Sequence, residues 1–224
     1  MTDRLILTLA ILGGTGKEGT GLAYRWANSG YHIIIGSRSS KKAKRVATEL
    51  NERLERDSVE GMRNADAARA CDIAVLTVPY SSQAETLEAL KSELSGKLLV
   101  DVTVPLNEDD ITVVKMPPAG SAAQEAQEIL GDATTVTAAL HVVSHTHLHG
   151  DGPIASDVLV CGDNAAAKEQ TMQLVAAAGL TGWDAGGLQN AVVAEGLASV
   201  LIGINKRYKI KSAGIRITGE QAPT

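Results

Sequence analysis

Phenylalanine is absent from this 224-residue sequence, and aromatic residues make up only 3% of it. The core is therefore expected to be aliphatic, and an aromatic cage around a ligand is not expected. The two cysteines, Cys71 and Cys161, are too few and too far apart for a disulfide framework, which favours a reduced intracellular compartment. The apolar run at the N-terminus is too short to span a membrane. We expect a soluble cytoplasmic protein with no membrane partner.

An excess of positive charge is also lacking. Lys and Arg total 21 against 26 Asp and Glu, a net charge of −5, which argues against a nucleic-acid partner. No GxSxG, HExxH or CxxC motif occurs, so no side-chain machinery for hydrolysis is evident. With 44% hydrophobic residues the chain can still bury a substantial core.

Apolar runs of strand length alternate with helical segments through the first 140 residues. This pattern predicts an α/β fold with a doubly wound parallel sheet. The expected strands are Leu5–Leu12, Tyr31–Ile35, Ser58–Met62, Asp72–Val78, Lys97–Val102 and Thr134–Leu140. The expected helices are Gly19–Ser29, Ser40–Arg56, Asn64–Ala70, Ser81–Leu94 and Ala122–Leu130.

A histidine- and glycine-rich segment then marks a candidate domain boundary. We assign residues 1–143 to the first domain and residues 144–224 to a small C-terminal α/β domain that ends in a long helix. Its expected elements are strands Asp157–Cys161 and Gly182–Ala185, and helices Ala165–Ala178 and Gln189–Arg207. The last six residues, "GEQAPT", are expected to be frayed.

The turn after the first strand contains Gly14-x-Gly16-x-x-Gly19 and opens a helix. In such a turn the first glycine allows the tight bend, the second lets the backbone approach a pyrophosphate, and the third permits close packing. Phosphates are then favoured by the free N–H groups of the helix N-terminus. The first domain is thus predicted to be a dinucleotide-binding Rossmann domain. The residues expected to bind the cofactor here are Gly14, Thr15, Gly16, Lys17 and Glu18.

The end of the second strand indicates which dinucleotide binds. An NAD site would carry Asp or Glu there, but this chain has "IIIGSRSSKK". The hydroxyl of Ser37, the guanidinium of Arg38, and Lys41 or Lys42 suit a 2′-phosphate, to which the hydroxyl of Thr15 could add. NADP is therefore favoured over NAD.

Several segments resemble the coenzyme F420-dependent NADP reductases: "LGGTGKEGTGLAYRWANSGYHIIIGSRSSKKA", "ACDIAVLTVPY", "AALH", "VCGDN", "DAGGL" and "KSAGIRITG". The resemblance runs in order along nearly the whole chain. It implies reversible hydride transfer between the deazaflavin coenzyme F420 and NADP. It also implies a Rossmann domain with a small C-terminal domain, a deazaflavin cleft between them, and a homodimer.

Individual residues follow from the resemblance. The 2′-phosphate contacts fall on Thr15, Ser37, Arg38 and Lys42, so the resemblance selects Lys42 over Lys41. Val78, Pro79 and Tyr80 would lie along the nicotinamide ribose, although Tyr80 is equally well explained as part of a strand end. His141 would stand beside the paired rings as a positioning residue, and no side chain is expected to act as a catalyst. The segment "DVTVPL", residues 101–106, ends another strand and is expected to line the cleft.

Two features lie outside the resemblance. His145, His147 and His149 would share one face of an extended chain and, with Asp151, could bind zinc, but nothing else in the sequence needs a metal. We therefore predict no metal site and a crossing loop that covers the cleft. The basic cluster Lys206, Arg207, Lys209 and Lys211 either attracts the anionic tail of coenzyme F420 or stabilises a helix C-terminus.

Two other functions remain open at the level of sequence. One is a related NADPH-dependent reductase of flavins or metal chelates. The other is a non-catalytic NADPH sensor. Turnover with coenzyme F420, FMN or a ferric chelate distinguishes the three.

Overall fold

The computed structural model describes residues 7–219, and they build one eight-stranded sheet in the order β3-β2-β1-β4-β5-β6-β7-β8. Every neighbouring pair is parallel except β6 and β7. The first six strands follow the doubly wound order, which confirms the predicted fold class. The strands are β1 (Thr8–Leu12), β2 (His32–Ser37), β3 (Val59–Arg63), β4 (Ile73–Leu76), β5 (Leu98–Asp101), β6 (Thr135–Ala138), β7 (Asp157–Gly162) and β8 (Thr181–Asp184).

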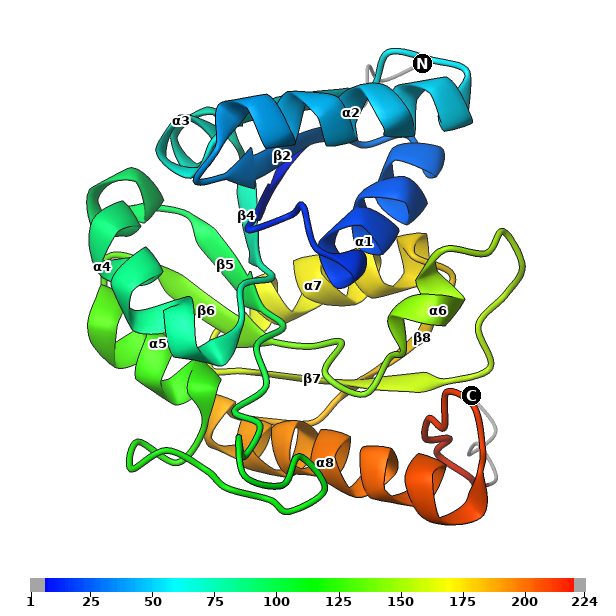
Figure 1. The fold of residues 1–224 in the computed structure, drawn as a ribbon. Coiled ribbons are helices and arrows are strands. Elements are labelled where there is room, and N and C mark those ends of the chain that lie inside the picture. The colour runs from blue at the N-terminus through cyan, green and yellow to red at the C-terminus, as the bar shows by residue number, and fades with distance from the viewer. Residues whose placement is uncertain (1–6, 220–224) are drawn as a thin grey trace, which may run out of the picture.

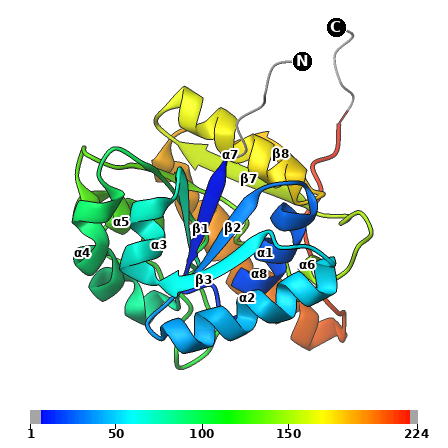
Figure 2. The same cartoon turned by 90° about the horizontal axis from the view of Figure 1, so that it is seen from above.

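Helices cover both faces of the sheet (Figure 1). They are α1 (Lys17–Asn28), α2 (Ser40–Leu54), α3 (Asn64–Ala70), α4 (Gln83–Leu94), α5 (Ala122–Leu130), α6 (His145–Leu148), α7 (Ala165–Ala177) and α8 (Ala191–Tyr208). Apolar residues of α1, α2 and α7 pack on one face, and those of α3, α4, α5 and the start of α8 pack on the other. Figure 2 shows α3, α4 and α5 on one side of the strands and α1 on the other.

Each central strand is buried on both sides, as its continuous apolar sequence predicts. Leu9 and Ile11 of β1 face the first layer of helices, while Ala10 and Leu12 face the second, because successive side chains of a strand point to opposite faces. The core is almost entirely aliphatic, as expected from the lack of Phe. Its one fully buried aromatic side chain, Trp26, donates from Nε1 to the carbonyl of Leu174 at 2.7 Å.

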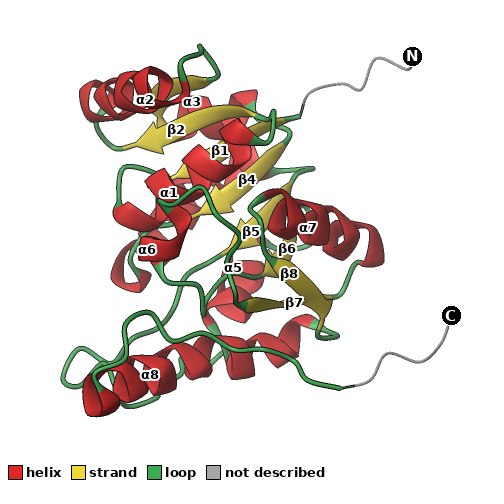
Figure 3. Cartoon of the chain, turned by 90° about the vertical axis from the view of Figure 1, so that its right-hand side faces the viewer, coloured by secondary structure: helices red, strands yellow, loops and turns green. Residues whose placement is uncertain are grey.

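The C-terminal strands extend the same sheet. β7 pairs with β6 in the antiparallel sense through Thr137–Gly162 and Ala138–Cys161, and β8 then pairs with β7 in parallel. The predicted parallel sheet did not include this reversal. The cause is the connection: the chain crosses the carboxyl edge through α6 and enters β7 from that side, without a helix to return it to the opposite edge (Figure 3). The division at residue 143 stays a prediction.

Most element boundaries agree with the sequence analysis to within a few residues, and the differences have local causes. Helix α2 ends at Leu54 because Glu55 adopts a left-handed conformation, φ 54°. Leu5 and Ile6 of the first expected strand, and most of the tail "GEQAPT", lie outside the described residues. The expected extended histidine segment instead contains one short helix, α6.

Among the described residues, one helical stretch, Leu188–Tyr208, is long and apolar enough to cross a membrane by length and composition alone. Several of its side chains, including Glu195 and Leu201, are buried inside the protein. It also contacts α5 and β7. This stretch is therefore explained as a core helix.

Candidate cofactor-binding site

The turn between β1 and α1 packs backbone against backbone. The amide of Gly14 donates to the carbonyls of Ile11 at 3.1 Å and Gly36 at 3.0 Å. A Cβ on Gly14 would lie 2.6 Å from the Ile11 oxygen, and one on Gly19 would lie 2.6 Å from the Cα of Gly14. The close-packing role expected of Gly19 fits this geometry. Gly13, at φ +74°, supplies the left-handed residue of the same turn.

The N-terminus of α1 is open to an anion. Gly16 is its N-cap, no side chain caps the first turn, and a Cβ built on Gly16 would meet nothing within 4 Å. The first N–H groups of the helix therefore face free space, where the dipole favours negative charge. This is the arrangement that a pyrophosphate requires.

The end of β2 supplies hydroxyl and basic groups at one end of the same space. Ser37, Arg38, Ser39 and Lys42 line it, whereas Lys41 does not. The hydroxyl of Ser39 accepts from the amide of Lys42 at 3.3 Å and so caps α2. This cap fixes the first turn of α2 next to the space, which places Lys42 rather than Lys41 on the cavity side.

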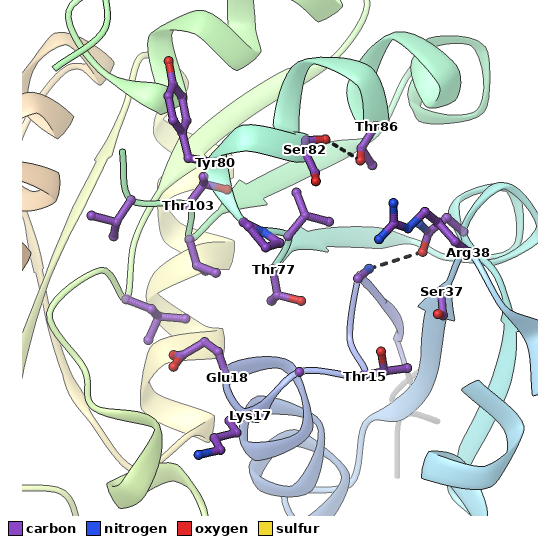
Figure 4. Close-up of a pocket in the computed structure, with 18 of the residues that line it drawn as sticks. Thr15, Lys17, Glu18, Ser37, Arg38, Thr77, Tyr80, Ser82, Thr86 and Thr103 are labelled. Atoms are coloured by element: carbon purple, nitrogen blue, oxygen red, sulfur yellow. Dashed lines mark hydrogen bonds between the residues drawn. The ribbon is translucent and has the colours of Figure 1, made fainter. Parts of the chain in front are cut away.

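These groups belong to one cavity of about 630 Å³ along the carboxyl ends of β1, β2, β4 and β5, the usual ligand position in a doubly wound sheet. Figure 4 shows Ser37 and Arg38 at one end and Glu18 and Tyr80 toward the other. All predicted binding residues except Gly14 line the cavity: Thr15, Gly16, Lys17, Glu18, Ser37, Arg38, Lys42, Val78, Pro79, Tyr80 and His141. Gly14 lies behind the turn that it stabilises.

Sequence reasoning missed several lining residues, among them Ser39, Asn64, Ser82 and Thr86. Asn64 is structurally informative because its Oδ1 accepts from the amide of Gly13 at 3.2 Å and holds the glycine turn. No local motif identifies it; its position at the end of β3, beside the turn, becomes apparent only once the strand order is known.

Tyr80 points its hydroxyl away from the cavity (Figure 4). The hydroxyl donates to Glu125 Oε2 of α5 at 2.8 Å. Burial, together with this carboxylate, raises the pKa of Tyr80 to about 12. The phenol is therefore a packing and anchoring group, and any contact of Tyr80 with a cofactor comes from its backbone or ring.

A second cavity of about 420 Å³ adjoins the first and is lined largely by the segment after His141 and by α8. The 101–106 segment was expected to line the cleft, and four of its residues, Val102, Thr103, Val104 and Leu106, lie along the cavities. The two cavities share one set of wall residues, here called the junction: Glu18, Val104, Leu106, His141 and Val143.

The junction carries polar atoms that lack a hydrogen-bond partner among the described residues. They are Oε1 of Glu18 and both ring nitrogens of His141. Burial raises the pKa of Glu18 to about 8 and lowers that of His141 to about 4, so both side chains are neutral at neutral pH. Unpaired buried polar atoms around two cavities fit polar ligands that satisfy them.

Two further acids are buried behind the cavities. Glu195 of α8 accepts from the amides of Ala122 at 2.7 Å and Ala123 at 3.1 Å and so caps α5. Burial nevertheless raises its pKa to about 8. Asp101 accepts from the amide of Thr103, and burial raises its pKa to about 6.

The three histidines after His141 do not converge on one point, and each has different surroundings. His145 lines the second cavity, His147 Nε2 contacts the carbonyl of Ser212 at 3.2 Å, and His149 Nε2 contacts the carbonyl of Lys17 at 2.9 Å. Asp151 instead accepts from the hydroxyl of Tyr24. Because the segment is helical over 145–148, the face that an extended chain would share is lost. Within residues 7–219, no group of three His, Cys, Asp or Glu residues is placed to hold a metal.

Helix α1 anchors this segment. The buried guanidinium of Arg25 donates to the carbonyls of His147, Leu148 and Gly152 at 2.8, 3.2 and 2.8 Å. Close packing completes the anchor, since a Cβ on Gly21 would lie 2.6 Å from the Cβ of Leu148. The helix that presents its N-terminus to the first cavity therefore also holds a wall of the second.

Comparison with known proteins identifies the family. The model of the family described as "NADP oxidoreductase coenzyme F420-dependent" matches residues 8–105. The F420-dependent NADP reductase of Methanocaldococcus jannaschii is 38% identical over 95% of this chain and 98% of its own length. The chain belongs to the F420-dependent NADP reductase family. This confirms the resemblance seen in the sequence.

A second curated relative and a solved structure support the same family membership. The F420-dependent NADP reductase of Methanothermobacter marburgensis is 39% identical over 95% of this chain and 98% of its own. The solved structure of an Arthrobacter sp. FB24 protein, assigned to the F420-dependent NADP reductases, is 26% identical, with a TM-score of 0.79 over 95% of this chain and all of that one. The family's fold thus extends over both cavities.

The buried acids predict a loss of stability as the pH rises. The folded protein keeps the protons of Glu18 and Glu195 up to about pH 8, whereas the unfolded chain releases them near 4.5. The folded state then binds more protons, so the free energy of unfolding falls as the pH rises toward 8. The lowered pKa of His141 has the opposite effect on the free energy of unfolding, but only below pH 6.5. Asp101 adds to the loss of stability only up to about pH 6.

We therefore expect the free energy of unfolding of the ligand-free protein to fall between pH 6.5 and 8. Each group contributes on the order of 1 kcal/mol per pH unit. Urea unfolding at both pH values measures it. Glu18→Gln should remove about half of the slope, while Glu88→Gln, on the exposed side of α4, should leave it intact. A flat profile in the unmodified protein would contradict the assignment.

Proposed function

We propose that this chain catalyses reversible hydride transfer between NADP and the deazaflavin coenzyme F420. The observation that carries the proposal is that two cavities, each suited to one organic ligand, meet at the junction of Glu18, Val104, Leu106, His141 and Val143. Hydride transfer needs two rings with their reacting carbons about 3–3.5 Å apart. A shared wall between two ligand spaces provides such a meeting point. The near-full-length relatives support this reading over a flavin reductase, a metal-chelate reductase or an NADPH sensor.

NADP is assigned to the larger cavity. Its pyrophosphate would bind at the first turn of α1, and its 2′-phosphate at Thr15, Ser37, Arg38 and Lys42. The nicotinamide would then lie beyond the pyrophosphate, along Val78 and Pro79 and near His141. The lack of an acid at the end of β2 supports NADP, because a carboxylate there would repel the phosphate.

The deazaflavin is assigned to the second cavity, against His141 and α8. There the ligands supply the redox chemistry, and the protein contributes position and exclusion of water. The neutral ring of His141 can offer one donor and one acceptor to a ring edge. This supports a positioning role rather than a catalytic one.

A homodimer in the cytoplasm is the expected assembly and location. Apolar side chains are exposed on α8, where Val193 is 62% and Val200 43% exposed, and on the segment that crosses it, where Val113 is 50% exposed. Continuous exposed apolar surface favours association with a partner. We assign this face to the dimer interface and residues 144–224 to a C-terminal domain that carries it.

The function is tested by mixing the protein with NADPH and purified coenzyme F420. The expected result is loss of the deazaflavin absorbance together with oxidation of NADPH. Parallel reactions with FMN and with a ferric chelate serve as controls. Turnover with either control but not with coenzyme F420 would support the alternative reductase, and tight NADPH binding without any turnover would support a sensor.

The two adjacent lysines of α2 provide a matched test of the 2′-phosphate site. Lys42→Ala should raise the dissociation constant of NADPH roughly 3- to 10-fold, the loss of one partly solvated charge contact of about 1 kcal/mol. Lys41→Ala removes the same charge outside the cavity and should have little effect. Titration calorimetry with NADPH and NADH measures both, and NADH affinity should be unchanged. Equal effects of the two substitutions would contradict the assignment.

The basic cluster Lys206, Arg207, Lys209 and Lys211 is exposed at the C-terminal end of α8, and the adjoining residues Asn205 and Ala213 line the second cavity. If it attracts the anionic tail of the coenzyme, Lys206→Ala/Arg207→Ala should raise the KM for coenzyme F420 at low salt and weaken its dependence on ionic strength. Steady-state kinetics across a salt series measures this. An unchanged KM would leave only the stabilising effect of positive charge at a helix C-terminus.

A further inference from the structure

The junction of the two cavities contains two titratable side chains, Glu18 and His141. Glu18 lies in the first turn of α1, two residues beyond the open N-cap, and Figure 4 shows it on the side of the cavity away from Ser37 and Arg38. Its Oε1 is buried without a partner among the described residues. Burying a carboxyl group without a hydrogen-bond partner costs free energy of desolvation, so its presence there calls for a function. The proposed reaction supplies one.

Hydride transfer between these two ligands also moves a proton. When C4 of NADPH gives a hydride to C5 of the deazaflavin, the nicotinamide gains a positive charge, and the deazaflavin gains the electron pair as negative charge centred on its ring nitrogen N1. Protonation of N1 completes the reduction. Inside a cavity walled in large part by Val, Leu, Ile and Ala side chains, leaving that negative charge unneutralised is costly.

We propose that Glu18 exchanges this proton: its carboxyl group protonates the deazaflavin as the hydride arrives, and its carboxylate removes the proton when the hydride returns to NADP. In the forward direction the C4–H bond of NADPH and the O–H bond of Glu18 break, and C5–H and N1–H bonds form. Oxidised NADP and the Glu18 carboxylate remain, and water reprotonates the carboxylate. The inference rests on the proposed function.

Glu18 is suited to this exchange, and the other groups around the cavities are not. A proton-exchanging group works best with a pKa near the operating pH, and the pKa of Glu18 is raised by burial to about 8. His141, with its pKa lowered by burial to about 4, stays neutral and cannot hold an extra proton near pH 7. Tyr80 is already bonded to Glu125.

The remaining titratable groups that line the cavities come from several elements. They are Lys17 of α1, Arg38 at the end of β2, Lys42 of α2 and His145 of α6. Figure 4 shows Lys17 next to Glu18 on α1, and Arg38 across the cavity from both. None of them offsets the effect of burial on the Glu18 pKa, for which desolvation is the cause.

The proton transfer also balances charge at the site. The Glu18 carboxylate is formed as the nicotinamide becomes cationic, so the two opposite charges arise together in a space of low polarity. It follows that ionised Glu18 should bind NADP more tightly than NADPH, whereas the neutral acid should distinguish them little. This effect on affinity is independent of turnover.

The first measurement is therefore of binding. The ratio of the NADPH to the NADP dissociation constants, determined by calorimetry in the absence of coenzyme F420, should rise about tenfold between pH 7 and 9. In Glu18→Gln, which keeps the size of the side chain but cannot ionise, the ratio should stay constant. Glu88→Gln should behave as the unmodified protein. A purely structural Glu18 would leave the ratio in Glu18→Gln as dependent on pH as before.

The second measurement is the hydride-transfer rate in single turnovers. Reduction of coenzyme F420 should slow as the pH rises through about 8, and reduction of NADP should accelerate. Glu18→Gln should lower both rates about 10²-fold or more and lose this pH dependence. Ionisation of the coenzyme itself affects the unmodified protein and the variants equally, so it does not contribute to the difference between their pH profiles. Glu18→Asp, which keeps an acid one methylene shorter, should restore part of the rate.

The outcomes separate the two proposals. If the unmodified protein does not oxidise NADPH with coenzyme F420, the proposed function fails. If it does, but Glu18→Gln retains the rate and the pH profile of the unmodified protein, the function stands and the role of Glu18 is overturned. Should Glu18→Gln fail to fold, Glu18→Asp decides: a lowered rate that keeps a pH dependence, with intact NADPH affinity, supports the role of the acid, and an unchanged rate and pH profile contradict it.

Discussion

Close backbone packing at the turn between β1 and α1 determines where everything else in the site lies. Gly14 is bonded to the carbonyls of both β1 and β2, and Gly19 lies against Gly14 with no room for a side chain. This contact fixes the first turn of α1 at the carboxyl edge of the sheet. The anion site at Gly16 and the carboxyl group of Glu18 are thereby placed in two adjoining cavities by a single helix turn. A shift of that turn would displace both together.

The same helix joins the two parts of the chain. The first turn of α1 faces the larger cavity, Trp26 bonds to α7, and Arg25 holds the segment that walls the smaller cavity. The antiparallel pairing of β6 and β7 brings α8 to the opposite wall of that smaller cavity. The site is thus assembled between elements that are distant in sequence and share one continuous sheet.

Much of the fold and part of the site could be predicted because they depend on local pattern. Continuous apolar runs such as Ile73–Leu76, alternating with helical segments, are typical of strands buried on both faces, and a glycine turn that opens a helix after such a strand indicates a phosphate site. The family resemblance then chose Lys42 over Lys41, and the structure places only Lys42 at the cavity.

What could not be predicted depends on the folded arrangement. The sequence does not show that Asn64 reaches Gly13, that β7 reverses direction, or that Tyr80 turns its hydroxyl to Glu125. His145, His147 and His149 resembled a metal-binding set because they alternate in sequence. The helical turn of α6 directs them to different surroundings. Glu18 was named only as part of the glycine turn, since nothing local indicates that its carboxyl group is buried between two cavities.

The way Arg25 holds the segment after His141 also separates the path of that segment from its side-chain chemistry. Arg25 donates only to main-chain oxygens, which every amino-acid type supplies equally. The Arg25 anchor therefore makes no demand on the side chains of this segment, although Leu148 is also buried against Gly21. The side chains make separate contacts: His147 reaches the carbonyl of Ser212 and His149 that of Lys17, while His145 faces the second cavity. The path of the wall and the chemistry that it presents are thus set by different parts of the same residues, main chain for the first and side chain for the second.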